Sequence, residues 1–258
     1  MGGAWVDWPA ADDSDRLTRY RQMTNLPGCF NIGESDYQYH GANRLGANSL
    51  LSCIFSGLVV GVEIPRYLDS LTKHYGEIDS KIFEKALAEE ENFKKELFAK
   101  KGKENVHKLH EELAEELVKH VTVKRDNHKL QETLNFIKKI RERFDNISLD
   151  DGAHLANQTY VFANQFKYMI ELALAITKGA LLRNEFRGSH FKPEFPQRDD
   201  EHWLKKTIAS YDARQDEPVI TYEPIDIRHL KPIKRDYSKA VKQKPHLENV
   251  PSEIKLPI

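Results

Sequence analysis

The residues best suited to chemistry gather in one short segment, GESDYQYHGANRLGANSLL, residues 33–51. Its single arginine, Arg44, stands among small residues, and the glycines on either side would let a ligand approach the backbone closely. A buried guanidinium needs an anion, and its planar fork suits a carboxylate or a phosphate. A salt bridge to Glu34 or Asp36 that holds a turn would satisfy Arg44 equally well. The residues alone favour neither interpretation.

A long apolar stretch follows the arginine, and we expect it to form a helix that begins near Asn48 and Ser49. Both residue types are common at helix N-caps. A helix start offers free N–H groups and a partial positive charge, which favour an anion. Arg44 and the helix start therefore predict one anion-binding corner. The segment lacks the GxGxxG spacing and the lysine of a P-loop, so it is not an ordinary nucleotide-binding loop.

Two other residues of this segment are candidates for a role in chemistry. Glu34 ends the β-like stretch GCFNIGE. Its carboxylate could accept hydrogen bonds from ligand hydroxyls, or could serve only as a cap or an ion-pair partner. His40 precedes the glycines and could act as a base, although a lone histidine is more often a structural hydrogen-bonding residue. The sequence has no HExxH, CxxC or GxSxG pattern, and we predict no metal site.

Composition limits the class of protein. The 258 residues carry a net charge of −1, so we expect no nucleic-acid partner. The two cysteines, Cys29 and Cys53, lack a metal-ligand spacing and are typical of a reducing, intracellular compartment. The longest apolar run, from Leu50 to Val62, is shorter than the ~20 residues that span a bilayer. The acidic N-terminus lacks the basic region of a signal peptide.

The elements that must position the candidate residues begin with two regions. Residues 1–65 suggest short strands, AWVDW and GCFNIGE, and then the helix NSLLSCIFSGLVVGV, which is apolar on nearly every face and so requires burial in a larger body. Residues 66–186 have apolar residues at helical spacing, which predicts an antiparallel helix bundle. We expect breaks at Gly102 and KRDNH, and a long last helix from about Ala153 to Arg183.

The third region, residues 187–258, is less regular. RGSHFKPEFPQRDDEHW combines prolines, aromatic residues and mixed charge, which predicts a structured loop. WLKKTIASYD favours a short helix, and EPVITYEP favours a strand. From Asp226 on, the chain is rich in lysine and proline, and we predict an extended, partly disordered tail.

The segment TNLPGCFNIGESDYQYHGANRLGANSLLSCIFSGLVVG resembles the flavoprotein subunit of succinate dehydrogenase and fumarate reductase. The leading MGG resembles the end of that family's HY-S/T-MGG segment. RGSHFKPEFPQRDDEHWLKKT and KPIKRDYSK look like its C-terminal region. The resemblance covers essentially the whole chain, and HGANRLGANSLL is its most specific motif.

The resemblance implies an α+β fold. Residues 1–65 would be the end of an α/β FAD-binding domain, residues 66–186 an antiparallel helical bundle, and residues 187–258 an irregular C-terminal domain with an extended tail. The family's dinucleotide fingerprint, its flavinylated histidine and its capping domain with the proton-transferring arginine would all lie upstream. We therefore expect Met1 to be an internal methionine and the chain to be the C-terminal portion of a longer subunit, with no catalytic residue of its own. Alone it should bind FAD poorly and be inactive.

The resemblance also implies a role for single residues. Arg44 matches the arginine that binds a carboxylate of succinate or fumarate, and Glu34 matches an acidic residue that contacts FAD. Ser49 and Leu50, with Asn48 beside them, match the helix start whose backbone meets the flavin, where it would stabilise negative charge on the reduced ring.

The activity that the resemblance implies is oxidation of succinate to fumarate, with hydride transfer to FAD and electron transfer to an iron–sulfur subunit. A cytochrome b membrane anchor would take part indirectly, and the chain would lie peripherally on the cytoplasmic side of the inner (cytoplasmic) membrane. A fumarate reductase and an L-aspartate oxidase flavoprotein are the near alternatives. A non-enzymatic helical module that docks on a partner is the alternative from another class.

Overall fold

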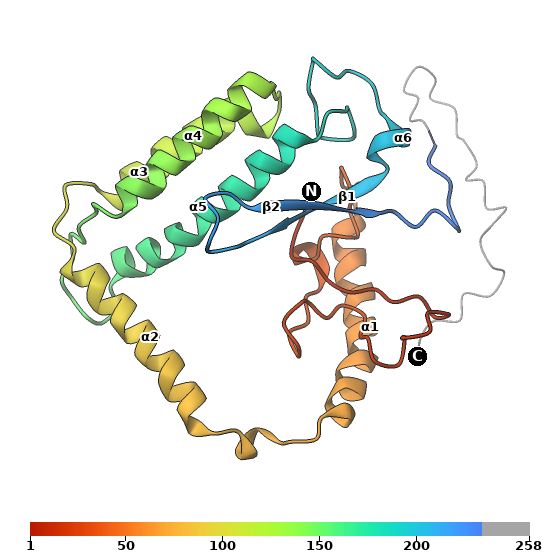
Figure 1. Ribbon diagram of the computed structural model, residues 1–258, viewed down its shortest axis with the longest axis horizontal. Coiled ribbons are helices and arrows are strands. Elements are labelled where there is room, and N and C mark those ends of the chain that lie inside the picture. Colours follow the sequence, from red (N-terminus) through yellow and green to blue (C-terminus); the bar gives the residue numbers. More distant parts are fainter. Residues whose placement is uncertain (234–258) are drawn as a thin grey trace. The chain divides into compact units, whose positions relative to one another are not determined.

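The computed structural model describes residues 1–233, which fold as helices with one small antiparallel sheet (Figure 1). The chain divides into two compact units. Unit 1 consists of Met1–Leu71, Asp199–Lys206 and the chain from Glu223 to Ile233, and unit 2 consists of Thr72–Arg198 and Thr207–Tyr222. The division into three domains at residues 65 and 186 remains a prediction. Most of the predicted tail, residues 234–258, lies outside the described residues.

The long helix α1 (Asn48–Ser70) organises unit 1 and begins where the sequence predicts. One of its faces packs against the chain that precedes it and buries Ser52, Ser56 and Glu63. The opposite face stays exposed, and Leu50 on that face is 75% exposed. The predicted burial on nearly every face is therefore not met within the described chain.

Helix α1 also bears on the membrane prediction. Within residues 1–233, one segment, Asn48–Glu77, is long and apolar enough to cross a membrane by length and composition alone. We predicted no such segment from the run Leu50–Val62, but the helix continues beyond that run to Ser70. The core helix of a globular protein passes the same test, so a single such helix is weak evidence. A buried carboxylate, Glu63, lies within this helix and binds Arg16 and Arg66.

The two short strands predicted for residues 1–65 are not formed. AWVDW and GCFNIGE make only isolated bridges, Ala4 with Asp36 and Met23 with Phe30. A strand needs a ladder of such bonds along a neighbouring strand. Because the described chain provides no such neighbour, these segments run as irregular backbone held by single hydrogen bonds, such as Ala4 N–H to Ser35 O at 2.8 Å.

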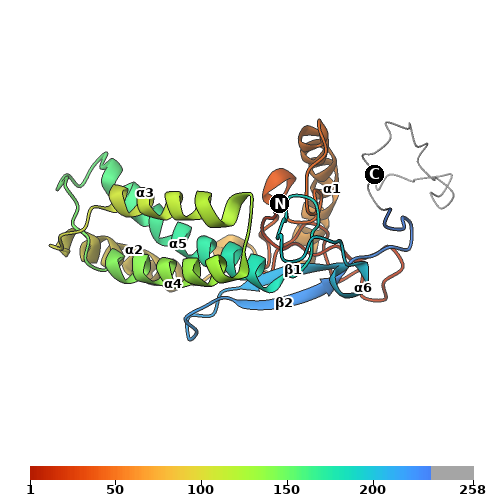
Figure 2. The ribbon, with the colours of Figure 1, turned by 90° about the horizontal axis from the view of Figure 1, so that it is seen from above.

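Unit 2 is built from helices, as the sequence predicts. They are α2 (Ser80–Ala99), α3 (Val106–Leu117), α4 (Asn127–Phe144) and α5 (Gln158–Leu182). Single turns flank two of them: η2 (Tyr75–Glu77) before α2 and the π turn η3 (Val118–Thr122) after α3. Helices α3, α4 and α5 lie side by side (Figure 2) and pack around one apolar core.

Helix α2 is attached to that core only near its end. Phe93 and Leu97 join the core, whereas Ile82 and Phe83 in the first turn are 62% and 58% exposed. The predicted break at Gly102 follows. A Cβ at this position would lie 1.6 Å from the carbonyl oxygen of Asn146, so only glycine fits where the chain passes the end of α4.

The rest of the chain forms α6 (Asp200–Trp203) and a two-stranded sheet of β1 (Lys205–Ser210) and β2 (Val219–Pro224). The strand predicted for EPVITYEP is confirmed. The helix predicted for WLKKTIASYD is wrong beyond Trp203, because β1 pairs with β2 there and its β-branched Thr207 and Ile208 suit a strand.

Candidate functional site

The loop that carries Arg44 lies at the start of α1. Its guanidinium donates from Nη1 to Ser49 Oγ at 2.6 Å, and Nε lies 3.9 Å from Glu34 Oε1. The Arg44 side chain is 38% exposed, so the expectation of a buried guanidinium is wrong for this chain. Of the two carboxylates considered as turn-holding partners, Glu34 is the neighbour and Asp36 is not an ion-pair partner of Arg44. The Glu34 contact is long enough to leave the guanidinium fork available for a second anion.

The start of α1 is open, although its N-cap differs from the prediction. The cap residue is Ala47 in a left-handed conformation (φ 65°), and no side chain caps the helix. Asn48 is already helical, and the hydroxyl of Ser49 serves Arg44 instead of a backbone N–H. The first-turn N–H groups of a helix have no intrahelical partner. This helix start therefore offers uncapped donors next to a cation, which suits an anion.

Glycines keep this corner accessible and compact. A Cβ at Gly41 or at Gly46 would meet nothing within 4 Å, so the backbone is open there. Gly33 has a different task, because its φ is +66° and a Cβ would lie 2.8 Å from Cys53 Sγ. Its N–H donates to Ser56 Oγ at 3.0 Å, which ties the short turn η1 (Gly33–Ser35) to α1. This turn presents Glu34, 57% exposed, beside Arg44.

A buried polar network lies beneath the loop. Asp36, 2% exposed, accepts from Gln22 Nε2 at 2.5 Å and from Gln38 N–H at 2.8 Å. Burial raises the pKa of the Asp36 carboxyl, and the hydrogen bonds oppose that rise. His40, two residues after Gln38, has its Nε2 3.3 Å from Ser52 Oγ. Sequence reasoning missed Gln22, which has no motif around it and adopts a left-handed φ of 66°.

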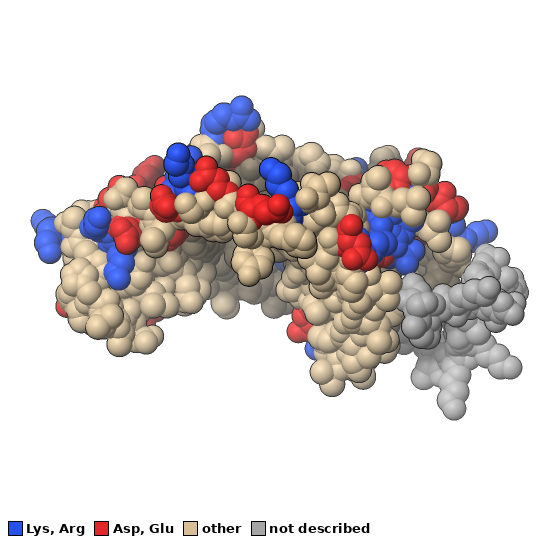
Figure 3. Space-filling view, turned by 90° about the horizontal axis from the view of Figure 1, so that it is seen from below, with Lys and Arg blue, Asp and Glu red and all other residues tan. Residues whose placement is uncertain are grey.

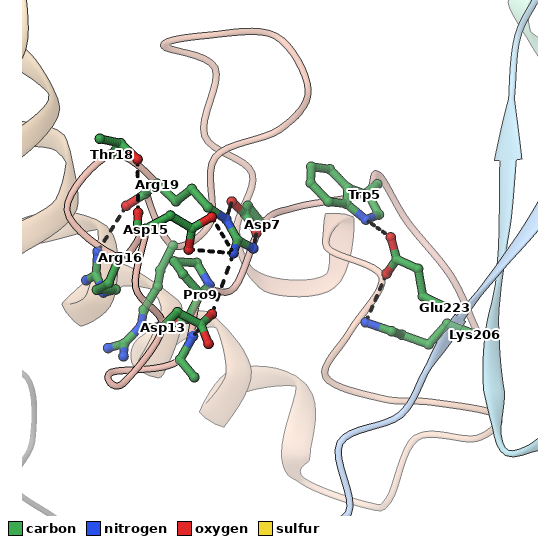
Figure 4. A network of polar contacts seen from close by, with 12 residues as sticks. Trp5, Asp7, Pro9, Asp13, Asp15, Arg16, Thr18, Arg19, Lys206 and Glu223 are labelled. Atoms are coloured by element: carbon green, nitrogen blue, oxygen red, sulfur yellow. Dashed lines mark hydrogen bonds and ion pairs between the residues drawn. The ribbon is translucent and has the colours of Figure 1, made fainter.

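The acidic side chains of the N-terminal segment of unit 1 lie against basic ones of the same unit. Arg19 gathers three carboxylates, Asp7 at 2.5 Å, Asp15 at 3.2 Å and Asp13 at 3.5 Å (Figure 4). Glu223 accepts from Trp5 Nε1 at 2.8 Å and pairs with Lys206 at 3.3 Å. On the face drawn in Figure 3, basic side chains likewise lie beside acidic ones. These charges therefore act as structural partners of one another.

Unit 2 contains a second group of buried charges, in the loop after α5. Glu185 is fully buried and pairs with Arg183 at 2.5 Å and Arg187 at 2.8 Å. Lys192 is also fully buried and donates to Leu181 O at 2.8 Å. Burial lowers the pKa of Lys192 to about 8. The prediction of a structured loop here is confirmed, but nothing in its sequence indicated that its charges would be interior.

His190 of this loop is held in its neutral form. Its Nδ1 accepts from Arg125 at 2.5 Å, and its Nε2–H donates to Arg183 O at 2.8 Å. Burial lowers the pKa of His190 to about 4, from an ordinary value near 6.5. Between these values the unfolded chain binds the proton and the folded chain does not. The contribution of His190 to the free energy of unfolding is therefore fully present above pH 6.5 and is lost as the pH falls towards 4.

The variant His190→Gln should remove this acid sensitivity. The lowered pKa of His190 corresponds to about 3 kcal/mol. Between pH 6.5 and 4, the free energy of unfolding of the wild type should therefore drop by about this amount more than that of the variant. Urea denaturation at several pH values measures it. His128→Gln, at a position with 75% side-chain exposure, is the control and should keep the wild-type pH profile. Equal acid losses in His190→Gln and wild type would contradict the prediction.

Comparison with known proteins finds a family model and relatives that agree on one protein family. Residues 110–237 match the family model described as fumarate reductase flavoprotein C-term. The chain is 42% identical over 239 residues to the succinate dehydrogenase flavoprotein subunit of Bacillus subtilis, covering 93% of this chain and 39% of that protein. It is 34% identical over 233 residues to the fumarate reductase flavoprotein subunit of Helicobacter pylori, covering 89% and 32%.

The solved structures give the same picture. An E. coli quinol fumarate reductase chain superposes with a TM-score of 0.73 at 27% identity, covering 83% of this chain and 36% of that one. The chain thus spans between 32% and 39% of the length of these relatives.

Proposed function

Because the chain belongs to the family of succinate dehydrogenase and fumarate reductase flavoprotein subunits, we propose that it forms part of the dicarboxylate and flavin sites of such an enzyme. The reaction is the interconversion of succinate and fumarate. We propose succinate oxidation as the direction, with fumarate reduction as the alternative; relatives of both kinds match, a succinate dehydrogenase subunit at 42% identity and a fumarate reductase subunit at 34%.

One observation carries the proposal: the Arg44 guanidinium lies at the uncapped start of α1, fixed on one side by Ser49. Its planar fork can bind one carboxylate of the substrate through two parallel hydrogen bonds. That contact would fix the angle at which the dicarboxylate is presented for reaction, a positioning effect that can supply several kcal/mol of the barrier reduction. Arg44 would thus bind and orient, and the proton transfer would fall to residues outside this chain.

The flavin site of the proposal uses the same corner. When bound, FAD supplies the acceptor of the two electrons. The donors present suit it, since the uncapped N–H groups of Ser49 and Leu50 can face ring oxygens and stabilise negative charge, whereas the Asn48 N–H donates to Leu45 O at 3.3 Å. Glu34, exposed beside them, can accept from ribose hydroxyls. The open backbone at Gly46 leaves room for a planar ring.

The proposal extends to partners and place. An iron–sulfur subunit would receive the electrons, and a cytochrome b anchor would hold the assembly, so that this chain lies peripherally on the cytoplasmic side of the inner membrane. The E. coli neighbour, a quinol fumarate reductase, supports a quinone as the final partner.

The direct test is to purify the gene product that carries this chain and assay it with succinate, fumarate and L-aspartate, using an artificial electron acceptor or donor. We expect flavin-dependent turnover of succinate and fumarate and none of aspartate. Turnover of aspartate alone would establish the oxidase instead. Absence of all three activities, together with flavin-free binding to an iron–sulfur subunit, would favour the helical interaction module.

A further inference from the structure

We propose that Ser52 and His40 are positioning residues for the Arg44 guanidinium, an inference that rests on the proposed function. Neither residue touches Arg44. They act by attaching the beginning of the Arg44 loop to the first turns of α1, while Ser49 attaches its end.

The hydrogen bonds of Ser52 have only one possible direction. Its Oγ lies 2.7 Å from the carbonyl oxygen of Ser49, which can only accept, so the Ser52 hydroxyl donates its proton there. The Ser52 oxygen is then the acceptor towards His40, whose Nε2 lies 3.3 Å away. His40 must therefore carry a proton on Nε2. The chain of donors runs from His40 through Ser52 to the backbone of Ser49.

Ser49 connects this series of hydrogen bonds to Arg44. Its carbonyl accepts from Ser52, and its hydroxyl accepts from Arg44 at 2.6 Å, because a guanidinium has only donors. Ser49 and Ser52 stand three residues apart and so lie on the same face of α1. His40 and Arg44 are thus clamped to neighbouring positions of one helix.

The backbone between these two attachments begins with a glycine. Gly41 follows His40 with φ +53°, and a Cβ there would meet nothing within 4 Å. The backbone N–H of Arg44 donates to the sulfur of Met1 at 3.0 Å, and a thioether is a weak acceptor. Loss of the Ser52 hydroxyl would free one end of the loop, and binding a carboxylate would then have to restore the order that the clamp provides beforehand.

The test measures binding of malonate, a dicarboxylate that lacks the adjacent methylenes needed for dehydrogenation, by calorimetry with the flavin-loaded gene product. Ser52→Ala and His40→Leu should each raise the Kd for malonate about tenfold, the effect of one lost hydrogen bond in a charged site. Ser52→Thr and His40→Gln keep the hydroxyl and an N–H donor, and should restore the Kd to within about twofold of wild type. Flavin content and melting temperature are recorded for each variant.

The chain offers a matched control in Ser70→Ala. Ser70 sits on the same helix, donates to the carbonyl three residues back, Tyr67 O, at 2.6 Å, and accepts from Tyr20 OH at 2.9 Å. The geometry repeats that of Ser52 but lies at the far end of α1, so Ser70→Ala should leave malonate binding unchanged.

The outcomes separate the two proposals. If Arg44→Ala abolishes malonate binding while Ser52→Ala and His40→Leu bind as wild type, the positioning role is wrong and the proposed function stands. If Arg44→Ala itself binds as wild type, the proposed function fails. If Ser52→Ala loses flavin and Ser52→Thr, which keeps the hydroxyl, does not restore malonate binding, the loss does not arise from the missing hydroxyl, which also overturns the inference.

Discussion

Replacing Arg44 with lysine should weaken dicarboxylate binding about 100-fold, which corresponds to about 2.7 kcal/mol. Lysine keeps the positive charge, but its ammonium is a point charge and cannot form two parallel hydrogen bonds to a carboxylate. It also cannot reproduce the contact by which Nη1 reaches Ser49 Oγ at 2.6 Å while Nε faces Glu34. The KM for succinate, measured with the gene product that carries this chain, should rise while flavin content stays the same.

The control for this substitution is Arg214→Lys. Arg214 is 88% exposed and pairs with Asp212 at 2.9 Å, within unit 2. We expect no change in KM there. An Arg44→Lys enzyme with the wild-type KM would show that the charge alone suffices, or that the guanidinium does not bind the substrate, and Arg44→Ala would distinguish these explanations.

Replacing Glu185 with glutamine should destabilise unit 2 by about 3–5 kcal/mol. The substitution is nearly isosteric, so it leaves the packing unchanged and removes only the charge. Arg183 and Arg187, whose side chains are 13% and 16% exposed, would then lose the carboxylate that they share. Removing the charge of one member of a buried ion pair costs far more than a surface pair contributes. Urea denaturation followed by helical circular dichroism measures the loss.

Glu132→Gln is the matched control for this prediction. Glu132 pairs with Lys129 at 2.8 Å on α4, but its side chain is 52% exposed, so solvent replaces the lost contact. The control should denature at the wild-type urea concentration. If Glu185→Gln does the same, the buried carboxylate is not what holds the loop after α5.

Much of the fold follows from sequence periodicity because helices carry their own signals. Asn105, Asp126 and Asn157 cap α3, α4 and α5 through their side chains, and each precedes an apolar pattern of helical period. The start of α1 followed the same logic and was placed correctly. Its cap was not, because Ala47 takes a left-handed conformation that no residue preference indicates.

Strands were harder to predict, because a strand depends on its neighbour rather than on its own residues. AWVDW has the composition of a strand yet lacks a continuous partner among the described residues. WLKKTIASYD favours a short helix by its sequence, yet its segment KKTIAS pairs with VITYEP and forms β1. The local sequence pattern of a segment does not show which other segment it will pair with.

The candidate site was predictable in part. Arg44 was expected near the start of α1, with Glu34 or Asp36 as a possible ion-pair partner, and in the structure Glu34 is the carboxylate beside it. Their roles toward substrate and flavin stay predictions. Buried charges such as Glu63 and Lys192 were not foreseen, because a charged residue in sequence is normally read as solvent-exposed. What makes them interior is the carboxylate, guanidinium or carbonyl that the fold brings from elsewhere in the chain.

The interleaving of the two units determines how the protein can be dissected. The chain passes between them four times, after Leu71, Arg198, Lys206 and Tyr222. An expression fragment of residues 72–198 would lack the part of unit 2 that supplies Glu217, which pairs with Lys138 at 2.5 Å and Lys178 at 3.0 Å. A single proteolytic cut after Leu71 would likewise leave the excised N-terminal piece attached to the rest of unit 1 by non-covalent contacts alone. Neither unit can therefore be produced as one uninterrupted stretch of polypeptide. A recombinant form of either unit must combine all the segments that belong to it.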